Sequence, residues 1–317
     1  MCLPDAQLIR TSRELFLAAI GGGAIDLDPW IVDRLTSLFE EVDVLAGQRV
    51  YAEGEHSEFI YFTREGRMRM VRQGHPDWTY EGRRVFGVFD AMIGRPHNRT
   101  AIALTDLHLL RLRAEHWIEI LEDSFDVVRI GIANSARITA GLEARRWARQ
   151  AEPKGVAIAT VPGVLNSPLS FVDRLAIVAT VGMLRSAGVQ VLADLVGMME
   201  ERAFEPGEAI YRRGHPSEDS FLLLAGEVLA ERSDPDLKVR FGPGCVICGT
   251  AGLGEPILAW DARALLKTRV LSMRLEDWYD TMEEHFDLAR SALATLALQQ
   301  ESVLDDLATA TGDIVEK

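Results

Sequence analysis

The residues of this chain whose types and spacing could bind an anion lie between Phe86 and Asp106. Gly87 precedes a short segment, residues 88–93, which ends at the turn Gly94-Arg95-Pro96. Residues 100–103, Thr-Ala-Ile-Ala, then alternate in the manner of a β-strand. This order predicts one short helix between two strands, with backbone N–H groups at the helix start where an anion could bind.

Cationic side chains follow the predicted short helix. Arg95 lies in the turn, and His97 and Arg99 are two residues apart, so a strand would place them on the same face. Together with backbone N–H groups, these side chains could hold a negatively charged ligand. The candidate ligand-binding residues are Gly87, Val88, His97, Asn98, Arg99 and Thr100.

Composition indicates an ordinary globular protein of two domains. The chain has 317 residues, of which 48% are hydrophobic and 26% charged. Its net charge of −14 argues against a broad nucleic-acid-binding face, because Lys and Arg must neutralise phosphates there. No apolar run approaches the roughly 20 residues that span a bilayer. Asp5 and Arg10 stand where a signal peptide needs an apolar core, so we predict a cytoplasmic protein without membrane insertion.

The cysteines and histidines do not predict a metal site. Cys2, Cys245 and Cys248 are an odd, low number, which is not typical of a disulfide framework. A structural zinc site needs four ligands, and the seven histidines are scattered. A redox pair of Cys245 and Cys248 is an alternative, but residues i and i+3 of a strand face opposite sides. We therefore expect two small buried thiols.

A duplication organises the chain. A β-rich run punctuated by glycines begins at Val44, and a similar run returns at residues 204–228. The chain holds two copies, which predicts a pair of domains and no solenoid. We expect domain 1 with its N-terminal helices at residues 1–150, a linker rich in Pro and Gly at 151–168, and domain 2 at 169–317. A shift of 160 residues places Gly47 on Gly207, Tyr51 on Tyr211, Gly54 on Gly214 and Gly66 on Gly226.

Each copy ends in a long helical segment with an apolar stripe. The second stripe keeps heptad spacing and could form a coiled-coil seam between two copies of the chain. The alternative is that each helix packs back on its own β-rich unit. We expect dimerisation through at least one of these helices. The second stripe consists of Met282, Phe286, Ala289, Leu293, Leu296, Val303 and Leu307, with Gln300 as its polar member.

The order of these elements resembles the cyclic nucleotide-binding domain of the catabolite activator protein, the protein kinase A regulatory subunit and cyclic-nucleotide-gated channels. The phrase V-x-x-G-x-x-x-Y-x-x-G, followed by YF-x-x-x-G, carries the resemblance over residues 28–140 and 188–310. It implies an α+β fold of two tandem antiparallel β-rolls, jelly-roll-like, each flanked by helices and ending in a long one. It also implies a phosphate-binding cassette, in which a Glu accepts the ribose hydroxyl and an Arg neutralises the cyclic phosphate.

The first copy keeps the frame of such a cassette and lacks its two key side chains. We call residues 86–103 cassette 1. The glycines, Pro96 and Thr100 stand where the family would have them, but Val88 takes the Glu position and His97 the Arg position. Valine has no hydrogen-bond acceptor, and histidine lacks the guanidinium fork. At about 1.5–3 kcal/mol for each charge-assisted hydrogen bond, both losses should cost at least two decades of affinity. Arg95 and Arg99 could compensate in part.

The second copy departs further from the pattern. We call residues 248–260 cassette 2; it is two residues shorter between the corresponding positions. We expect its apolar replacements to form a sealed core, with the indole of Trp260 filling the pocket. The residues at its cassette positions are Gly249, Thr250, Ile257 and Trp260.

Two other readings fit less well. A bicupin enzyme would share the tandem β-rolls but needs convergent metal ligands. A transcription factor needs a helix-turn-helix, and the heptad stripe occupies the residues after the second β-roll. We predict a non-enzymatic regulatory or scaffolding protein without cofactor, acting on a protein partner or as a homodimer. The alternative is a sensor of a cyclic nucleotide or another anion in domain 1, bound by Arg99, His97 and backbone N–H groups.

Overall fold

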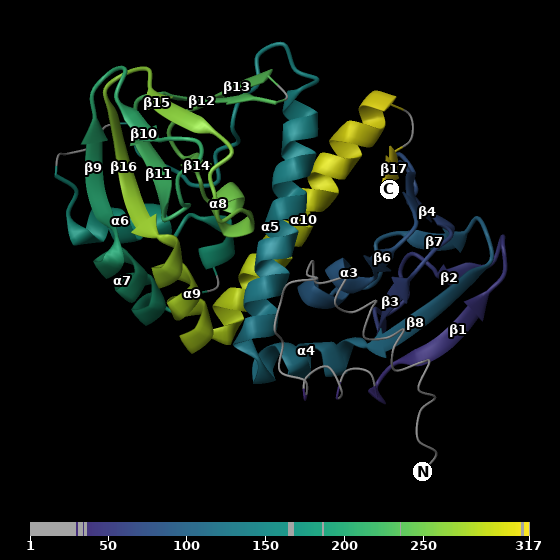
Figure 1. Ribbon diagram of the computed structural model, residues 1–317. Helices are drawn as coiled ribbons and strands as arrows, with labels where there is room; N and C mark the ends of the chain where they lie inside the picture. Colours follow the sequence, from purple (N-terminus) through teal and green to yellow (C-terminus); the bar gives the residue numbers. More distant parts are fainter. Residues whose placement is uncertain are drawn as a thin grey trace. The chain divides into compact units, whose positions relative to one another are not determined.

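The computed structural model describes residues 30, 34, 37–163, 168–185, 187–234, 236–311 and 314–316, and Figure 1 shows the chain. The N-terminal helices predicted ahead of the first β-rich run lie largely outside these described residues. Residue contacts divide the chain into two compact units. Unit 1 consists of residues 1–131 and 300–317, and unit 2 of residues 132–299.

Unit 1 contains two antiparallel sheets. Their strand orders are β1-β8-β3-β6 and β5-β4-β7-β2, and β17 (Ile314–Glu316) adds to β5 in parallel. Strand β4 shows why the sequence folds this way, since Met68 and Met70 alternate inward with outward-facing arginines. The strands are β1 (Glu40–Val44), β2 (Arg49–Tyr51), β3 (Phe59–Thr63), β4 (Arg67–Val71), β5 (Trp78–Glu81), β6 (Arg84–Phe86), β7 (Thr100–Ala103) and β8 (Leu107–Arg113).

Unit 2 repeats this arrangement with the orders β14-β11-β16-β9 and β10-β15-β12-β13. Strands β9 and β10 begin 160 residues after β1 and β2, which confirms the duplication. The predicted α+β fold of two tandem antiparallel β-rolls is likewise confirmed. The strands are β9 (Glu200–Phe204), β10 (Ala209–Tyr211), β11 (Asp219–Ala225), β12 (Val228–Ser233), β13 (Asp236–Phe241), β14 (Val246–Ile247), β15 (Asp261–Ala264) and β16 (Thr268–Arg274).

The helices flank the two β-rolls. Helix α6 begins with a capping box, in which the Ser170 hydroxyl accepts the backbone N–H of Asp173 and the Asp173 carboxylate accepts that of Ser170. The helices are α3 (Val88–Ile93), α4 (Ala114–Asp123), α5 (Phe125–Trp147), α6 (Phe171–Val178), the 3-10 turn η1 (Gly182–Leu184), α7 (Val189–Met198), α8 (Thr250–Gly254), α9 (Leu275–Glu284) and α10 (Phe286–Thr311).

The long helical segments differ from the expected uninterrupted stripe. The first breaks at Ser124, which has extended backbone, and the second breaks at His285. Met282 therefore lies in α9 and the rest of its stripe in α10. Leu296, Val303 and Leu307 of that stripe are already buried within the single chain. Val303 and Leu307 lie in the part of α10 that residue contacts assign to unit 1, so their burial does not show that α10 packs on its own β-rich unit. A homodimer through the seam stays a prediction.

The boundaries of the two compact units differ from those of the two sequence copies. Residues from 300 onward belong to unit 1, although the duplication places them in the second copy. The expected linker, as far as it is described, belongs to unit 2. There the Gly155 N–H donates to the Arg240 carbonyl at 2.8 Å and the Ile158 N–H to the Gly244 carbonyl at 2.9 Å. The boundaries 1–150, 151–168 and 169–317 therefore describe the sequence copies.

Other expectations concern single residues and segments. Cys245 and Cys248 are free and buried, as predicted. Among the described residues no helix has the length and apolarity to cross a membrane. Within the same described ranges no group of three or more His, Cys, Asp or Glu residues has a geometry that could hold a metal ion.

A buried glutamate in unit 2 predicts a pH effect on stability. Glu143 of α5 accepts a hydrogen bond from the Gln299 amide of α10 at 2.8 Å. Burial raises the pKa of Glu143 above its ordinary value of 4.5. This group therefore stabilises the fold fully below pH 4.5 and loses that contribution as pH rises through its folded pKa.

Glu143→Gln is expected to keep that contribution at every pH. Its free energy of unfolding should exceed that of the unaltered protein at pH 7, and the difference should shrink to zero near pH 4. Urea denaturation at the two pH values measures this. Glu122→Gln, at an exposed position of α4, is the control for loss of a charge. A variant less stable than the parent at pH 7 would contradict the assignment.

Candidate functional site

Cassette 1 has the local structure that the sequence predicts. Helix α3 covers residues 88–93, β7 begins at Thr100, and the turn between them lies at residues 94–96. Gly87 starts the helix with a φ of 79° and Gly94 ends it with a φ of 73°. Both values lie in the left-handed region that glycine adopts with little strain. The glycines thus fix the frame on which the candidate residues stand.

Gly87 is also closely packed, so its substitution should be costly. A Cβ atom there would lie 3.0 Å from the Phe59 carbonyl oxygen. Gly82 has the same φ of 79° but open space around it. We expect Gly82→Ala to lower the free energy of unfolding by about 1 kcal/mol through backbone strain, and Gly87→Ala by at least about twice as much. Thermal or urea denaturation of both variants tests this, and equal losses would contradict it.

An acidic side chain lies at the centre of cassette 1. Asp90, on α3, is 5% exposed. Its carboxylate accepts Nε of Arg95 at 2.7 Å and the backbone N–H of Asn98 at 3.3 Å. It also lies 3.2 Å from Nδ1 of His97. The turn therefore does hold an anion, and the anion is a carboxylate of the chain itself.

His97 is enclosed by neighbours. Its ring is 2% exposed and stacks on Tyr51 with centroids 3.6 Å apart. Nδ1 also lies 3.4 Å from the Ser57 hydroxyl. Within the described part of the chain the Tyr51 hydroxyl has no hydrogen-bond partner, and burial, followed by the nearby Asp90 charge, raises its pKa well above 10.0. His97 is thus a packed and hydrogen-bonded residue.

Glu301 of α10 reaches the same turn. Its carboxylate accepts Nη2 of Arg95 and the Asn98 side-chain amide, the latter at 2.8 Å. The pKa of Arg95 is raised: burial alone would lower it, but the hydrogen bond to Asp90 and the Glu301 charge outweigh burial. Burial raises the pKa of Glu301, and Arg95 opposes that rise. Arg95 is therefore a cation held between two carboxylates.

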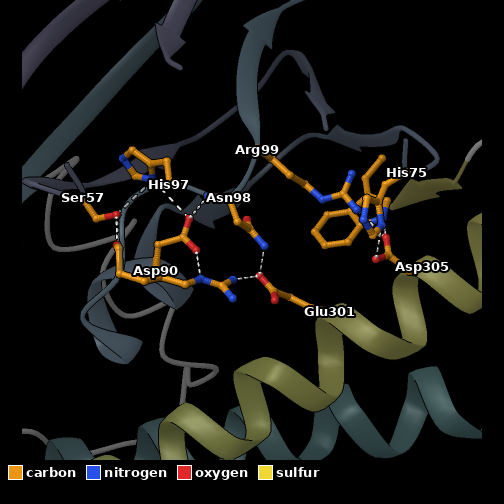
Figure 2. Close-up of polar contacts among 10 residues, drawn as sticks. Ser57, His75, Asp90, His97, Asn98, Arg99, Glu301 and Asp305 are labelled. Carbon is orange, nitrogen blue, oxygen red and sulfur yellow. Dashed lines mark hydrogen bonds and ion pairs between the residues drawn. The ribbon is translucent and has the colours of Figure 1, made fainter. Parts of the chain in front are cut away.

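Arg99 is paired with a second carboxylate of α10. Its side chain is 2% exposed, and its guanidinium lies 3.6 Å from the centre of the Trp78 ring. Nη1 donates to the Pro76 carbonyl at 2.9 Å, and Nη2 donates to Asp305. Asp305 also accepts the Trp78 indole N–H at 3.1 Å and lies 3.2 Å from Nδ1 of His75 (Figure 2). Burial lowers the pKa of Arg99, and Asp305 opposes this.

The expectation that strand alternation places His97 and Arg99 on the same face is wrong. Residues 97–99 precede β7, so strand alternation does not govern them. Figure 2 shows the His97 ring beside Asp90, while Arg99 extends toward Asp305. His97 and Asn98 contact Asp90, and Asn98 also donates to Glu301, whereas Arg99 donates to Asp305. Gly87 lies beside the His97 ring. The Thr100 hydroxyl accepts the backbone N–H of Glu53 at 3.0 Å, and Val88 is half-buried without a polar contact to offer.

Cassette 2 is closed by aromatic packing. Gly249 and Thr250 begin α8, and Trp260 packs against the core of the β-roll. Trp147, near the end of α5, lies edge-on to Trp260 with ring centres 5.9 Å apart. A cavity of only about 10 Å³ remains, which is roughly room for one water. It is lined by Tyr211, Ser217, Cys248, Ala251, Glu255, Leu258, Ala259 and Trp260.

The expected sealed core of cassette 2 needs one correction. Ile257, which stands at the family's Arg position, is 50% exposed. Its backbone forms an isolated bridge with Pro216, so the chain runs along the surface at this point. The adjacent Leu258 is buried in its place. Trp260 packs against the core of the β-roll, and Ile257 does not.

Sequence reasoning missed several residues of both cassettes. The pattern F-G-E-x-A-L of the resembled cassette has an Ala two residues after the Glu position, and Asp90 stands there in this chain, so this departure was a readable signal. Glu301 and Asp305 are four residues apart on a predicted helix and thus share one face, a weaker signal. For Trp78 and Trp147 the sequence offers no comparable pattern.

Comparisons with known proteins agree with this architecture. The sequence profile described as the cyclic nucleotide-binding domain matches residues 41–124 and again residues 201–285, together more than half of the chain. A comparison with curated protein sequences finds no match.

Three solved structures align with nearly the whole chain at low sequence identity and low TM-scores. The regulatory subunit of a cAMP-independent protein kinase A from Trypanosoma brucei has 14% identity and a TM-score of 0.37, covering 95% of this chain and 94% of its own. The corresponding Trypanosoma cruzi protein bound to guanosine has 13% identity and a TM-score of 0.35, covering 98% and 97%. The regulatory domain of Toxoplasma gondii PKA with cAMP has 13% identity and a TM-score of 0.35, covering 93% and 98%.

Proposed function

Because the chain belongs to the cyclic nucleotide-binding domain family, we propose that it is a non-enzymatic regulatory or scaffolding protein whose cassettes hold the chain's own side chains in place of a cyclic nucleotide. It acts through a protein partner. The acidic net charge of −14 supports a partner other than nucleic acid.

The observation that carries this proposal is the pairing of charges in cassette 1. Arg95 binds Asp90 and Glu301, and Arg99 binds Asp305. A cyclic phosphate would have to displace carboxylates that are tethered to the chain and therefore present at high effective concentration. Val88 offers no acceptor for a ribose hydroxyl. A cyclic nucleotide would therefore bind cassette 1 more weakly than the chain's own carboxylates do.

Cassette 2 supports the same conclusion by a different route. Trp147 and Trp260 occupy it together with Phe241, whose ring centre lies 6.0 Å from that of Trp147. A nucleotide would have to expel these rings from an apolar cluster. The cavity left beside them is smaller than any nucleotide.

Calorimetric titration of the full chain with cAMP, cGMP and cyclic dinucleotides tests the proposal. We expect no saturable heat, which corresponds to a Kd weaker than about 1 mM. A micromolar Kd that is lost in Arg99→Ala would instead establish the alternative, a sensor of an anionic ligand in cassette 1. A micromolar Kd that persists in Arg99→Ala and becomes tighter in folded Trp147→Ala, which removes one of the rings that fill cassette 2, would place the ligand there.

A further inference from the structure

Two carboxylates one helical turn apart enter cassette 1 from the end of α10. Glu301 and Asp305 occupy positions i and i+4 of the helix and point toward the same surface of unit 1 (Figure 2). Separate groups of donors receive them. These donors, which we call the receptor cluster, are His75, Trp78, Arg95, Asn98 and Arg99.

The two arginines of the receptor cluster have supports outside α10. Asp90 holds Nε of Arg95 at 2.7 Å. The Pro76 carbonyl and the Trp78 ring hold the guanidinium of Arg99. If the end of α10 withdrew, these supports would remain. The cluster is therefore preorganised for a pair of carboxylates, and such preorganisation lowers the cost of binding.

Arg99 also requires an anionic occupant. Its side chain is almost completely buried, and within the described residues its Nε has no hydrogen-bond partner. A buried guanidinium that lost Asp305 would be left without its compensating charge, which is strongly unfavourable. Exchange of one acidic helix for another would leave the guanidinium of Arg99 paired with a carboxylate.

The end of α10 also presents apolar groups between and after its two carboxylates. Val303, Leu304, Leu307 and Ala308 are each at most 3% exposed. The ligand that matches the receptor cluster is therefore a helix with apolar side chains and two carboxylates at a fixed spacing. Neither a free carboxylate nor a phosphate supplies both features.

We propose that cassette 1 is a docking site for an acidic helix of a partner protein, with carboxylates at positions i and i+4, and that residues 300–311 of α10 are its intramolecular competitor. This inference rests on the proposed function, because it names the chemistry of the protein partner. In the isolated chain the competitor occupies the site. A partner helix of the same pattern replaces it.

Fluorescence anisotropy with a labelled peptide of residues 298–311 tests this on the full chain. The double variant E301Q/D305N weakens the internal competitor but keeps an amide oxygen to accept from the donors. We expect the peptide to bind this variant at least tenfold more tightly than it binds the unaltered protein. A matched peptide with Gln and Asn at positions 301 and 305 should bind at least tenfold more weakly than the acidic peptide.

Changes in the receptor cluster provide the matched controls. Adding Arg95→Gln to the double variant should weaken binding of the acidic peptide at least tenfold. Adding Arg111→Gln removes an ion pair at the surface between Arg111 of β8 and Glu40 of β1. This change should leave binding of the acidic peptide unchanged. Near-UV circular dichroism establishes that each variant is folded, and E301Q and D305N alone replace the double variant if it is not.

Equal binding of the acidic and neutral peptides would overturn the proposal, as would absence of binding to a folded variant with a weakened competitor. These results are separable from the proposed function. A chain that binds neither cyclic nucleotides nor the acidic peptide would retain its filled cassettes and lose only this docking site. A chain that binds cAMP would contradict the proposed function itself.

Discussion

Trp147→Ala is expected to lower the free energy of unfolding by about 3–5 kcal/mol, the usual range for removing a buried aromatic side chain. Trp147 is 8% exposed and belongs to a buried cluster with Ala144, Leu237 and Val239. Its removal also leaves Trp260 without its edge-on partner. Urea denaturation followed by circular dichroism measures the loss.

Leu298→Ala is the matched control for the Trp147 prediction. Leu298 also lies on a helix of unit 2, but it is 47% exposed. Its truncation should change stability by no more than about 0.5 kcal/mol. If both variants lost the same stability, or if Trp147→Ala lost less than about 1 kcal/mol, Trp147 would not be the side chain that closes cassette 2.

Asp305→Ala is expected to lower the free energy of unfolding by about 3 kcal/mol, because it leaves the buried charge of Arg99 without its carboxylate. It also removes the acceptor of the Trp78 indole N–H. Asp305→Asn should cost less, since its amide oxygen can still accept both hydrogen bonds. Urea denaturation of the two variants gives the comparison.

Glu283→Ala serves as the control for the Asp305 series. It removes an exposed carboxylate from α9 and should cost at most about 0.5 kcal/mol. If Asp305→Ala cost no more than this control, the contact between Arg99 and α10 would contribute nothing measurable. The self-occupied cassette would then lose its main support.

Short-range patterns were sufficient for the frame of cassette 1. The glycines at 87 and 94 and the alternation of residues 100–103 predicted α3 and β7 with the bounds that the structure has. Local sequence determines these elements, because a left-handed φ favours glycine and a half-buried strand needs alternation. The duplicated glycines likewise predicted the second β-roll.

The occupants of cassette 1 could not be predicted in the same way. Glu301 and Asp305 are each 206 residues from the arginine that they bind. Only the packing of the chain determines such a contact. The role of Asp90 could have been predicted from the local sequence, because a carboxylate at a position that usually has a small residue can replace an external anion. The shared face of His97 and Arg99 failed because β7 begins only at Thr100.

In cassette 2 the sequence indicated Trp260, but it did not indicate Trp147, which packs against Trp260. An indole at position 260 is too large for an open pocket, so Trp260 could be predicted from size alone. Trp147 is 113 residues away, at the last position of α5 and beyond the residues of the first apolar stripe, so local spacing did not assign it a face. Ile257 was assigned to the core by its apolar type, but exposed apolar residues are common in folded proteins.

NMR of the arginine side chains tests most directly whether carboxylates of the chain occupy cassette 1. Buried, hydrogen-bonded N–H groups exchange slowly with water, whereas solvated ones exchange quickly. We predict resolved, slowly exchanging Nη–H signals for Arg95 and Arg99 that stay unchanged when cAMP is added. Rapidly exchanging signals, or signals that shift on titration with cAMP, would show an open cassette and contradict the account.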